Sequence, residues 1–161
     1  MPHLLSQTTI MLLSFCSVLA QKAPEFVFPN FEFPDGTYLK DHSDKGVILV
    51  YWDSSCPASK KAQDHLKIRH KRWKEWGFPI VYMSLDSDPQ DLKQNFGIPT
   101  WPLYCDGKSW DSPWVTAADI HAVPTLYVLN HNLKLRFKAE NVGQMDLWLL
   151  KNKSDPNWSV S

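Results

Sequence analysis

The sequence predicts an α/β fold with a mixed central sheet, helices on both faces of the sheet and an N-terminal hairpin extension. Two observations favour this class. Apolar, β-branched runs at 46–52 and 78–85 alternate with segments of helical period at 58–76 and 88–97. Beyond residue 123, two short strand patterns and an amphipathic helix follow one another. Strands joined through helices favour parallel pairing, whereas the later strands, joined by a tight turn, favour antiparallel pairing.

The N-terminal hairpin is predicted from aromatic, extended segments on either side of Pro34-Asp35-Gly36, whose residue types favour a turn. The run at 46–52 is apolar throughout, as expected of a strand that is covered on both faces. The helix at 58–76 carries apolar residues at helical spacing and stops before Gly77, a residue type favoured just past a helix C-terminus. A strand followed directly by a helix is therefore expected around residue 56.

The second half of the chain contains shorter elements. A helix at 88–97 begins with an Asp-Pro pair suited to a helix start, and a short extended piece follows at 100–105. Ser112-Pro113 starts a brief helix. Strands are predicted at 126–129 and 133–137, and the last amphipathic helix at 142–150.

The chain of 161 residues is long enough for one domain with a substantial core. Its first 20 residues contain no Asp, Glu, Lys or Arg, and Val18-Leu19-Ala20 resembles a small-residue cleavage site. We expect a signal peptide at 1–20, a folded domain at 21–151 and a loose polar tail at 152–161. These features indicate a secreted or periplasmic protein with no stable membrane insertion after cleavage; lipid attachment at Cys16 is the alternative.

The charges of the chain balance, because Lys+Arg and Asp+Glu both number 17. No net field draws the protein toward nucleic acid, so no nucleic-acid partner is expected, and we expect a monomer. The helix at 58–76 is nevertheless basic: Lys60, Lys61, Lys67, Arg69, Lys71, Arg72 and Lys74. We interpret this charge as a solvated helix face, with the docking of an acidic partner as the alternative.

The segment Val50-Tyr51-Trp52-Asp53-Ser54-Ser55-Cys56-Pro57-Ala58-Ser59 resembles the active-site region of the thioredoxin superfamily, closest to its exported TlpA-like (redoxin) branch. In that branch a strand ends in an aromatic pair and runs into Cys-Pro-x-Cys. Val123-Pro124-Thr125 is similar to the cis-proline segment of the branch. The likeness covers residues 23–150 and implies a thioredoxin-like fold with a nucleophilic Cys56.

The resemblance also implies further site residues. Pro124 would be cis and face Cys56, and Val123 would offer backbone hydrogen bonds to a bound peptide. An acid after the following strand serves the site in this branch, and Asp86 or Asp88 is the nearest match. Two more residues are candidates for substrate binding, Pro57 beside the cysteine and Trp114 in the tryptophan-rich segment before Pro124; the alternative for Trp114 is a place in the core.

Cys56 is expected at a helix N-terminus, where unpaired N–H groups and the nearby Lys60 and Lys61 lower a thiol pKa. The chain departs from the family motif at Ser59, which occupies the place of the second cysteine. A serine hydroxyl donates a hydrogen bond to a thiolate but cannot accept a sulfur. The site is therefore expected to hold mixed disulfides or to depend on an external thiol, unless Cys105 serves as a distant resolving thiol.

These residues favour a monothiol disulfide oxidoreductase, with protein thiol or disulfide clients and an external reductant as partners. No metal site and no cofactor are expected. The alternative is a redox-silent thioredoxin-fold module that binds partners in the same groove. A peroxiredoxin-like peroxidase is less favoured, because Leu49 and Asp53 stand where that family places Pro and Thr.

Overall fold

The computed structural model describes residues 25–96 and 100–158. Its sheet is made of β1 (Gly46–Trp52), β2 (Ile80–Ser84), β3 (Leu103–Cys105), β4 (Thr125–Asn130) and β5 (Leu135–Ala139). The α-helices are α1 (Pro57–Glu75), α2 (Pro89–Phe96), α3 (Pro113–Ala117) and α4 (Val142–Asn152). Short 3₁₀ turns are η1 (Leu39–His42), η2 (Ser109–Asp111) and η3 (Pro156–Trp158).

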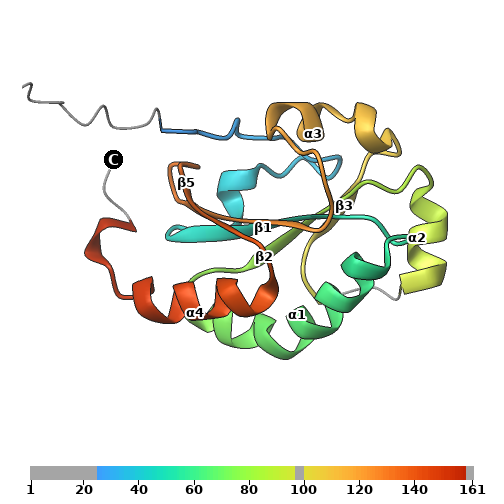
Figure 1. Ribbon diagram of the computed structural model, residues 1–161. Coiled ribbons are helices and arrows are strands. Elements are labelled where there is room, and N and C mark those ends of the chain that lie inside the picture. The colour runs from blue at the N-terminus through green and yellow to red at the C-terminus, as the bar shows by residue number, and fades with distance from the viewer. Residues whose placement is uncertain (1–24, 97–99, 159–161) are drawn as a thin grey trace, which may run out of the picture.

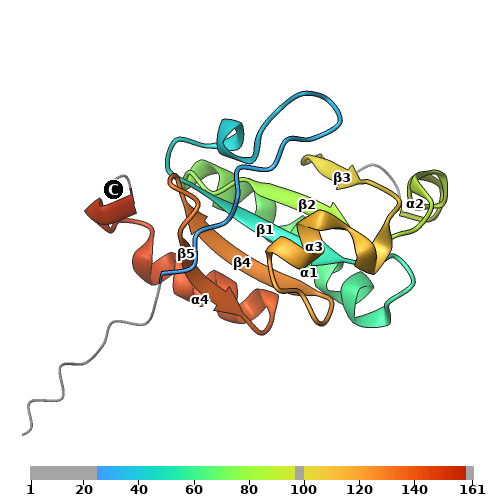
Figure 2. The ribbon, with the colours of Figure 1, turned by 90° about the horizontal axis from the view of Figure 1, so that it is seen from above.

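The five strands lie in the order β3-β2-β1-β4-β5 (Figure 2). β1 pairs in parallel with β2, and β2 with β3, whereas β4 is antiparallel to both β1 and β5. Every residue of β1, β2 and β4 is buried, as expected of strands covered on both faces. The predicted mixed sheet is confirmed.

Helices α1 and α4 cover one face of the sheet (Figure 1). Leu66 and Trp73 of α1 and Met145 and Leu149 of α4 are fully buried there, against the side chains of alternate residues in the central strands. Their helical spacing places them on one stripe of each helix, as the sequence predicts. This packing holds the N-terminus of α1 at the end of β1.

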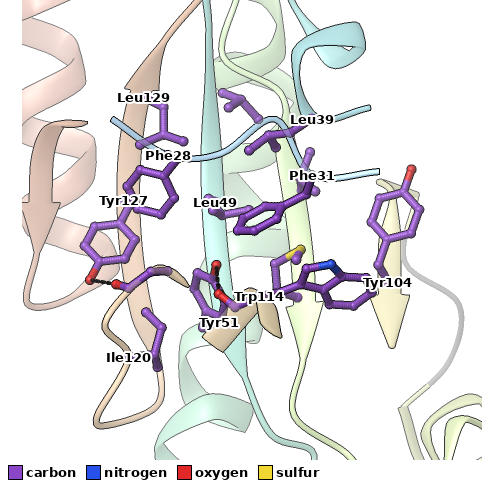
Figure 3. Close-up of a cluster of buried hydrophobic side chains, with 14 of the residues drawn as sticks. Phe28, Phe31, Leu39, Leu49, Tyr51, Tyr104, Trp114, Ile120, Tyr127 and Leu129 are labelled. Atoms are coloured by element: carbon purple, nitrogen blue, oxygen red, sulfur yellow. Dashed lines mark hydrogen bonds between the residues drawn. The ribbon is translucent and has the colours of Figure 1, made fainter. Parts of the chain in front are cut away.

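The opposite face is covered by α3 and the aromatic segment before β1 (Figure 3). Phe28 and Leu39 from that segment pack with Tyr51 of β1 and Tyr127 of β4, and all four are buried. The Tyr51 hydroxyl donates a 2.9 Å hydrogen bond to the carbonyl of Trp114 in α3. Both faces of the sheet are thus filled, and the prediction of helices on both faces is confirmed.

The N-terminal hairpin is present but shorter than predicted. Glu32 and Tyr38 form a single antiparallel bridge around the turn, in which Gly36 adopts a φ of 81°. Inside it, the Phe33 N–H donates to the Thr37 carbonyl at 2.8 Å. On the other side of the bridge the Leu39 N–H donates to the Phe31 carbonyl at 2.9 Å, and the pairing ends there because Leu39 begins η1.

Residues 152–158 are packed against the domain, so this part of the predicted loose tail is ordered, and residues 159–161 lie outside the described residues. Trp158 has an exposed fraction of 1%. Its ring lies 4.6 Å from that of Phe78, and its indole N–H donates to the Asn152 carbonyl at 2.7 Å. Arg136 also binds the segment, through Asp155 and the Asn157 carbonyl.

The predicted signal peptide lies outside the described residues. Within 25–96 and 100–158, no helix combines the length and apolar character needed to cross a bilayer.

Candidate functional site

Cys56 is the N-cap residue of α1, directly after the loop that leaves β1. Its φ of −81° and ψ of 117° are extended, and its carbonyl accepts the hydrogen bond from the Lys60 N–H at 3.1 Å. Pro57 occupies the first turn of α1 and is exposed. Proline suits this position because its missing N–H would have had no partner within the helix. The half-buried thiol therefore faces the free N–H groups of a helix N-terminus.

The Val123-Pro124 segment meets Cys56 across the sheet. The Val123-Pro124 peptide bond is cis, as predicted, and the Cys56 thiol donates to the Val123 carbonyl with a sulfur-to-oxygen distance of 3.7 Å. These residues are 67 positions apart in the chain. They come together because Thr125 begins β4 and pairs with Tyr51 near the end of β1.

Hydrogen bonds to the sulfur lower the pKa of Cys56. The largest contribution is the backbone N–H of Ser59, and the Ser59 hydroxyl and the Ala58 N–H add to it; partial burial and the charge of Asp53 act in the opposite direction. Ser59 is buried, and its hydroxyl also accepts from the Asp53 N–H at 3.3 Å. The thiolate is thus stabilised by hydrogen bonds from the first turn of α1.

Lys60 and Lys61 are exposed side chains, and neither contributes to the lowered pKa of Cys56. The prediction that these two charges assist the thiolate is therefore not supported. Their side chains extend into solvent, where a charge interaction is weakened by the surrounding water.

The Asp86 carboxylate is hydrogen-bonded to the loop that precedes Cys56. Its carboxylate accepts hydrogen bonds from the backbone N–H of Ser54, at 3.2 and 3.3 Å, and from the Ser54 hydroxyl. The Ser84 hydroxyl donates to the same carboxylate at 2.5 Å. Among the described residues, no hydrogen bond joins this carboxylate to the Cys56 thiol. The geometry is that of a positioning residue for the loop rather than of a direct proton acceptor from the thiol.

Cys105 and Cys56 are both free thiols, and each donates a hydrogen bond to a different backbone carbonyl. The Cys105 thiol donates to the Asp86 carbonyl at 3.2 Å, and burial raises its pKa. Cys105 is level with Ser84, and Ser84 with Trp52, so two strand spacings of about 4.8 Å separate Cys105 from β1. A disulfide requires Cα atoms within about 7 Å of each other. The two thiols are not joined to each other in the structure, and a resolving role for Cys105 stays a prediction.

Trp114 belongs to the core, so its prediction as a substrate-binding residue is not supported. Trp114 lies among the buried side chains of the cluster in Figure 3. Its exposed fraction is 8%, and its ring packs edge-on against Phe33 with 5.8 Å between ring centres. Large aromatic side chains contribute most to stability when they are covered in this way. Val123, in contrast, is half-buried and lies beside the thiol.

Two hollows open beside the first turn of α1. One, of about 550 Å³, is polar and contains the side chains around Asp53, Lys60 and Asp86. The other, of about 570 Å³, we call the α1–α4 groove. It is lined by Ala58, Lys61, Ala62, His65, Arg69, Pro124, Leu126, Glu140, Asn141, Val142 and Gly143. Sequence reasoning missed this groove because its walls come from three separate parts of the chain; the spacing of Lys61, His65 and Arg69 is its one local signal.

No group of three or more His, Cys, Asp or Glu side chains that could hold a metal ion is found in the described part of the chain. The side chains that gather at the site are instead suited to thiol chemistry.

Comparison with known proteins adds relatives of one kind. No family model matches the chain. It is 31% identical over 74 residues to the thiol-disulfide oxidoreductase ResA of Bacillus thuringiensis subsp. konkukian, covering 46% of this chain and 41% of that protein. ResA of Bacillus subtilis is 26% identical over 109 residues, covering 63% of this chain and 59% of that protein. The chain thus spans about half the length of these relatives.

Solved structures share the fold. The thioredoxin domain of a thiol-disulfide oxidoreductase from Bacteroides vulgatus matches with a TM-score of 0.62 at 18% identity, covering 80% of this chain and 93% of that domain. A domain of a possible thiol-disulfide isomerase from Cytophaga hutchinsonii gives 0.64 at 24% identity, covering 79% and 90%. Together with the sheet order, these matches show a thioredoxin-like fold, and over part of its length the chain is similar in sequence to thiol-disulfide oxidoreductases named ResA.

Proposed function

We propose that this protein catalyses thiol-disulfide exchange through one nucleophilic cysteine, Cys56. One observation carries the proposal. A thiol of lowered pKa sits at the N-cap of α1 against the Val123 carbonyl, and a buried serine stands where the second thiol of the motif would be. Lowered thiol pKa values are typical of catalytic rather than structural cysteines. The name of the ResA relatives supports the same chemistry.

The exchange begins when the Cys56 thiolate attacks one sulfur of a client disulfide. A bond forms between Cys56 and that sulfur, the client S–S bond breaks, and its electron pair leaves on the other client sulfur as a thiolate. Cys56 and the client are then joined in a mixed disulfide, and the released thiolate takes a proton from water. The N–H groups of Ala58 and Ser59 stabilise the Cys56 thiolate before attack and after its release.

Completion of the cycle requires a second thiol that this site does not supply. An external thiolate attacks the client sulfur of the mixed disulfide, the electron pair returns to Cys56, and the client is left joined to that external sulfur. If the attacking thiolate belongs to the client itself, the client disulfide is rearranged rather than reduced. Ser59 contributes a hydrogen bond to the departing thiolate but no sulfur.

The clients we propose are proteins that carry disulfides, because such bonds persist outside the reducing cytoplasm. We keep the proposal of a signal peptide at 1–20 with export to the periplasm or beyond, since the run at 10–19 is largely apolar and Val18-Leu19-Ala20 resembles a small-residue cleavage site. The proposed mature unit begins at residue 21, and its reductant is an external thiol.

The test is adduct formation followed by intact mass. Wild-type protein, Cys56→Ala and the matched control Cys105→Ala are incubated with a peptide whose single cysteine is joined by a disulfide to 5-thio-2-nitrobenzoate, so that the leaving thiolate departs from the peptide. We expect one peptide adduct on wild-type and Cys105→Ala, and none on Cys56→Ala. An adduct that forms on Cys105 instead contradicts the proposal.

The competing function is a redox-silent binding module. It is distinguished by capture of the same peptide in its reduced, alkylated form. Capture that is equal in wild-type and Cys56→Ala, with no adduct on either, would favour the binding module over thiol exchange.

A further inference from the structure

The α1–α4 groove begins two residues after Cys56, at Ala58, and runs along α1 to Arg69. Its floor includes the apolar Ala62, Pro124 and Leu126, so an occupant that contacts Pro124 also lies next to the thiol. We propose that this groove binds an acidic polypeptide segment next to the reacting cysteine of the client. This inference rests on the proposed function and adds a substrate class to it.

The nitrogen-bearing side chains of the groove form a row. Lys61, His65 and Arg69 follow one another at intervals of four residues on one face of α1, with the charged Lys61 and Arg69 at its ends. Four helical residues span about 6 Å along the axis. Two residues of an extended chain span about 6.6 Å. Carboxylates at alternate positions of an extended peptide therefore match the spacing of the row, and two of them can pair with Lys61 and Arg69.

The length of the groove also suits a polypeptide. From Ala58 to Arg69 the axis of α1 advances about 16 Å. An extended chain of five residues has nearly this length, at about 3.3 Å per residue. The volume of about 570 Å³ is compatible with a segment of that size. An extended segment starting at the thiol can thus contact Lys61, His65 and Arg69.

The local charge balance favours an anionic occupant. Lys61 is exposed and forms no ion pair with any described residue. Arg69 shares Asp146 with Arg72, whose guanidinium is nearer to this carboxylate (2.6 Å against 3.4 Å), so two cations face one anion there. Glu140 is the acidic residue in the lining of the groove. The positive charge is therefore only partly compensated.

The test uses synthetic peptides with a single cysteine flanked on both sides by serine alternating with aspartate. A matched peptide has asparagine at each aspartate position. Each cysteine carries 5-thio-2-nitrobenzoate as a disulfide, and release of that aromatic thiolate by Cys56 gives the rate of exchange. A second pair of peptides has serine in place of the cysteine, and its affinity is measured by fluorescence anisotropy.

We expect the aspartate peptide to react about tenfold faster than its asparagine partner at low ionic strength. Two aspartates of the peptide can pair with Lys61 and Arg69, and each pair should increase the rate by about threefold. Lys61→Gln is expected to reduce that ratio by about threefold. Lys67→Gln removes the same charge from an exposed position of α1 outside the groove and should leave the ratio unchanged. Glu140→Gln should increase it.

Equal rates and equal affinities for the two peptides would overturn the inference. So would an equal loss in Lys61→Gln and Lys67→Gln, because the preference would then follow net charge rather than the groove. If no peptide reacts, the proposed function fails, and the cysteine-free peptides still decide this inference: a Lys61-dependent preference for aspartate supports the groove, and its absence refutes it.

Discussion

Trp158 packs the segment at 153–158 against the domain. Its replacement by alanine measures how much this packing contributes to the free energy of unfolding. Its ring is 1% exposed and packs between the ring of Phe78 and the guanidinium of Arg136, whose carbon lies 4.9 Å from the ring centre. The indole N–H is also satisfied, by the Asn152 carbonyl at 2.7 Å. Trp158→Ala removes all of these contacts together.

The expected loss follows from burial. A tryptophan buries up to about 250 Å², which at about 25 cal/mol per Å² is an upper limit of about 6 kcal/mol. Measured losses for Trp→Ala in cores are about 3–5 kcal/mol. If the segment detaches, its backbone regains conformational freedom, which limits the loss. We therefore expect Trp158→Ala to lower the free energy of unfolding by about 3 kcal/mol, the low end of the core range.

The assay is urea unfolding followed by far-ultraviolet circular dichroism, a signal that does not depend on tryptophan emission. Trp110→Ala is the matched control, because Trp110 is 46% exposed. We expect Trp110→Ala to cost less than about 1 kcal/mol. Equal losses in the two variants, or a loss below about 0.5 kcal/mol for Trp158→Ala, would refute the packing described for this tail.

Two further predictions concern titrating groups. Hydrogen bonds lower the pKa of Cys56 and burial raises that of Cys105, so at neutral pH iodoacetamide should modify Cys56 first, as peptide mapping will show; modification of Cys105 first contradicts this. For Asp146, burial is the largest single effect and raises the pKa, but hydrogen bonds from Trp73 and Arg72 together with the charges of Arg72 and Arg69 outweigh it and lower the pKa from 3.8. A lowered carboxyl pKa stabilises the fold above pH 3.8 and is lost as pH falls through the folded-state value. The stability deficit of Asp146→Asn, measured by urea unfolding, should therefore be larger at neutral pH than in acid; a deficit independent of pH speaks against this linkage.

Local patterns predicted the elements that carry the site. The apolar run of β1 and the helical spacing of α1 place a strand directly before a helix, and Gly77, with a φ of 90°, ends that helix as its residue type suggests. The position of Cys56 at the N-cap follows from these two elements alone. The family motif was needed for the cis bond before Pro124, which has no signature in spacing or composition.

Contacts between distant residues account for what the sequence did not reveal. Asp86 braces Ser54 across 32 positions, and Trp158 docks on Phe78. Neither pairing produces a periodic signal, because each depends on how the strands are ordered in the sheet. Sequence alone indicates a solvated helix face for the basic side chains of α1, for the same reason. Only the fold places Pro124 and the start of α4 opposite Lys61, His65 and Arg69.

The lifetime of the mixed disulfide tests the central claim most directly, namely that Cys56 reacts and that Ser59 cannot resolve the product. A peptide whose single cysteine carries 5-thio-2-nitrobenzoate as a disulfide forms the adduct on Cys105→Ser and on the double variant Cys105→Ser/Ser59→Cys. The released aromatic thiolate is removed, and decay of the adduct without added thiol is followed by intact mass. We expect a persistent adduct on the first protein. On the second, release should be faster by at least on the order of a thousandfold, because the new thiol lies next to the bond. Equally rapid loss from both proteins would contradict the account.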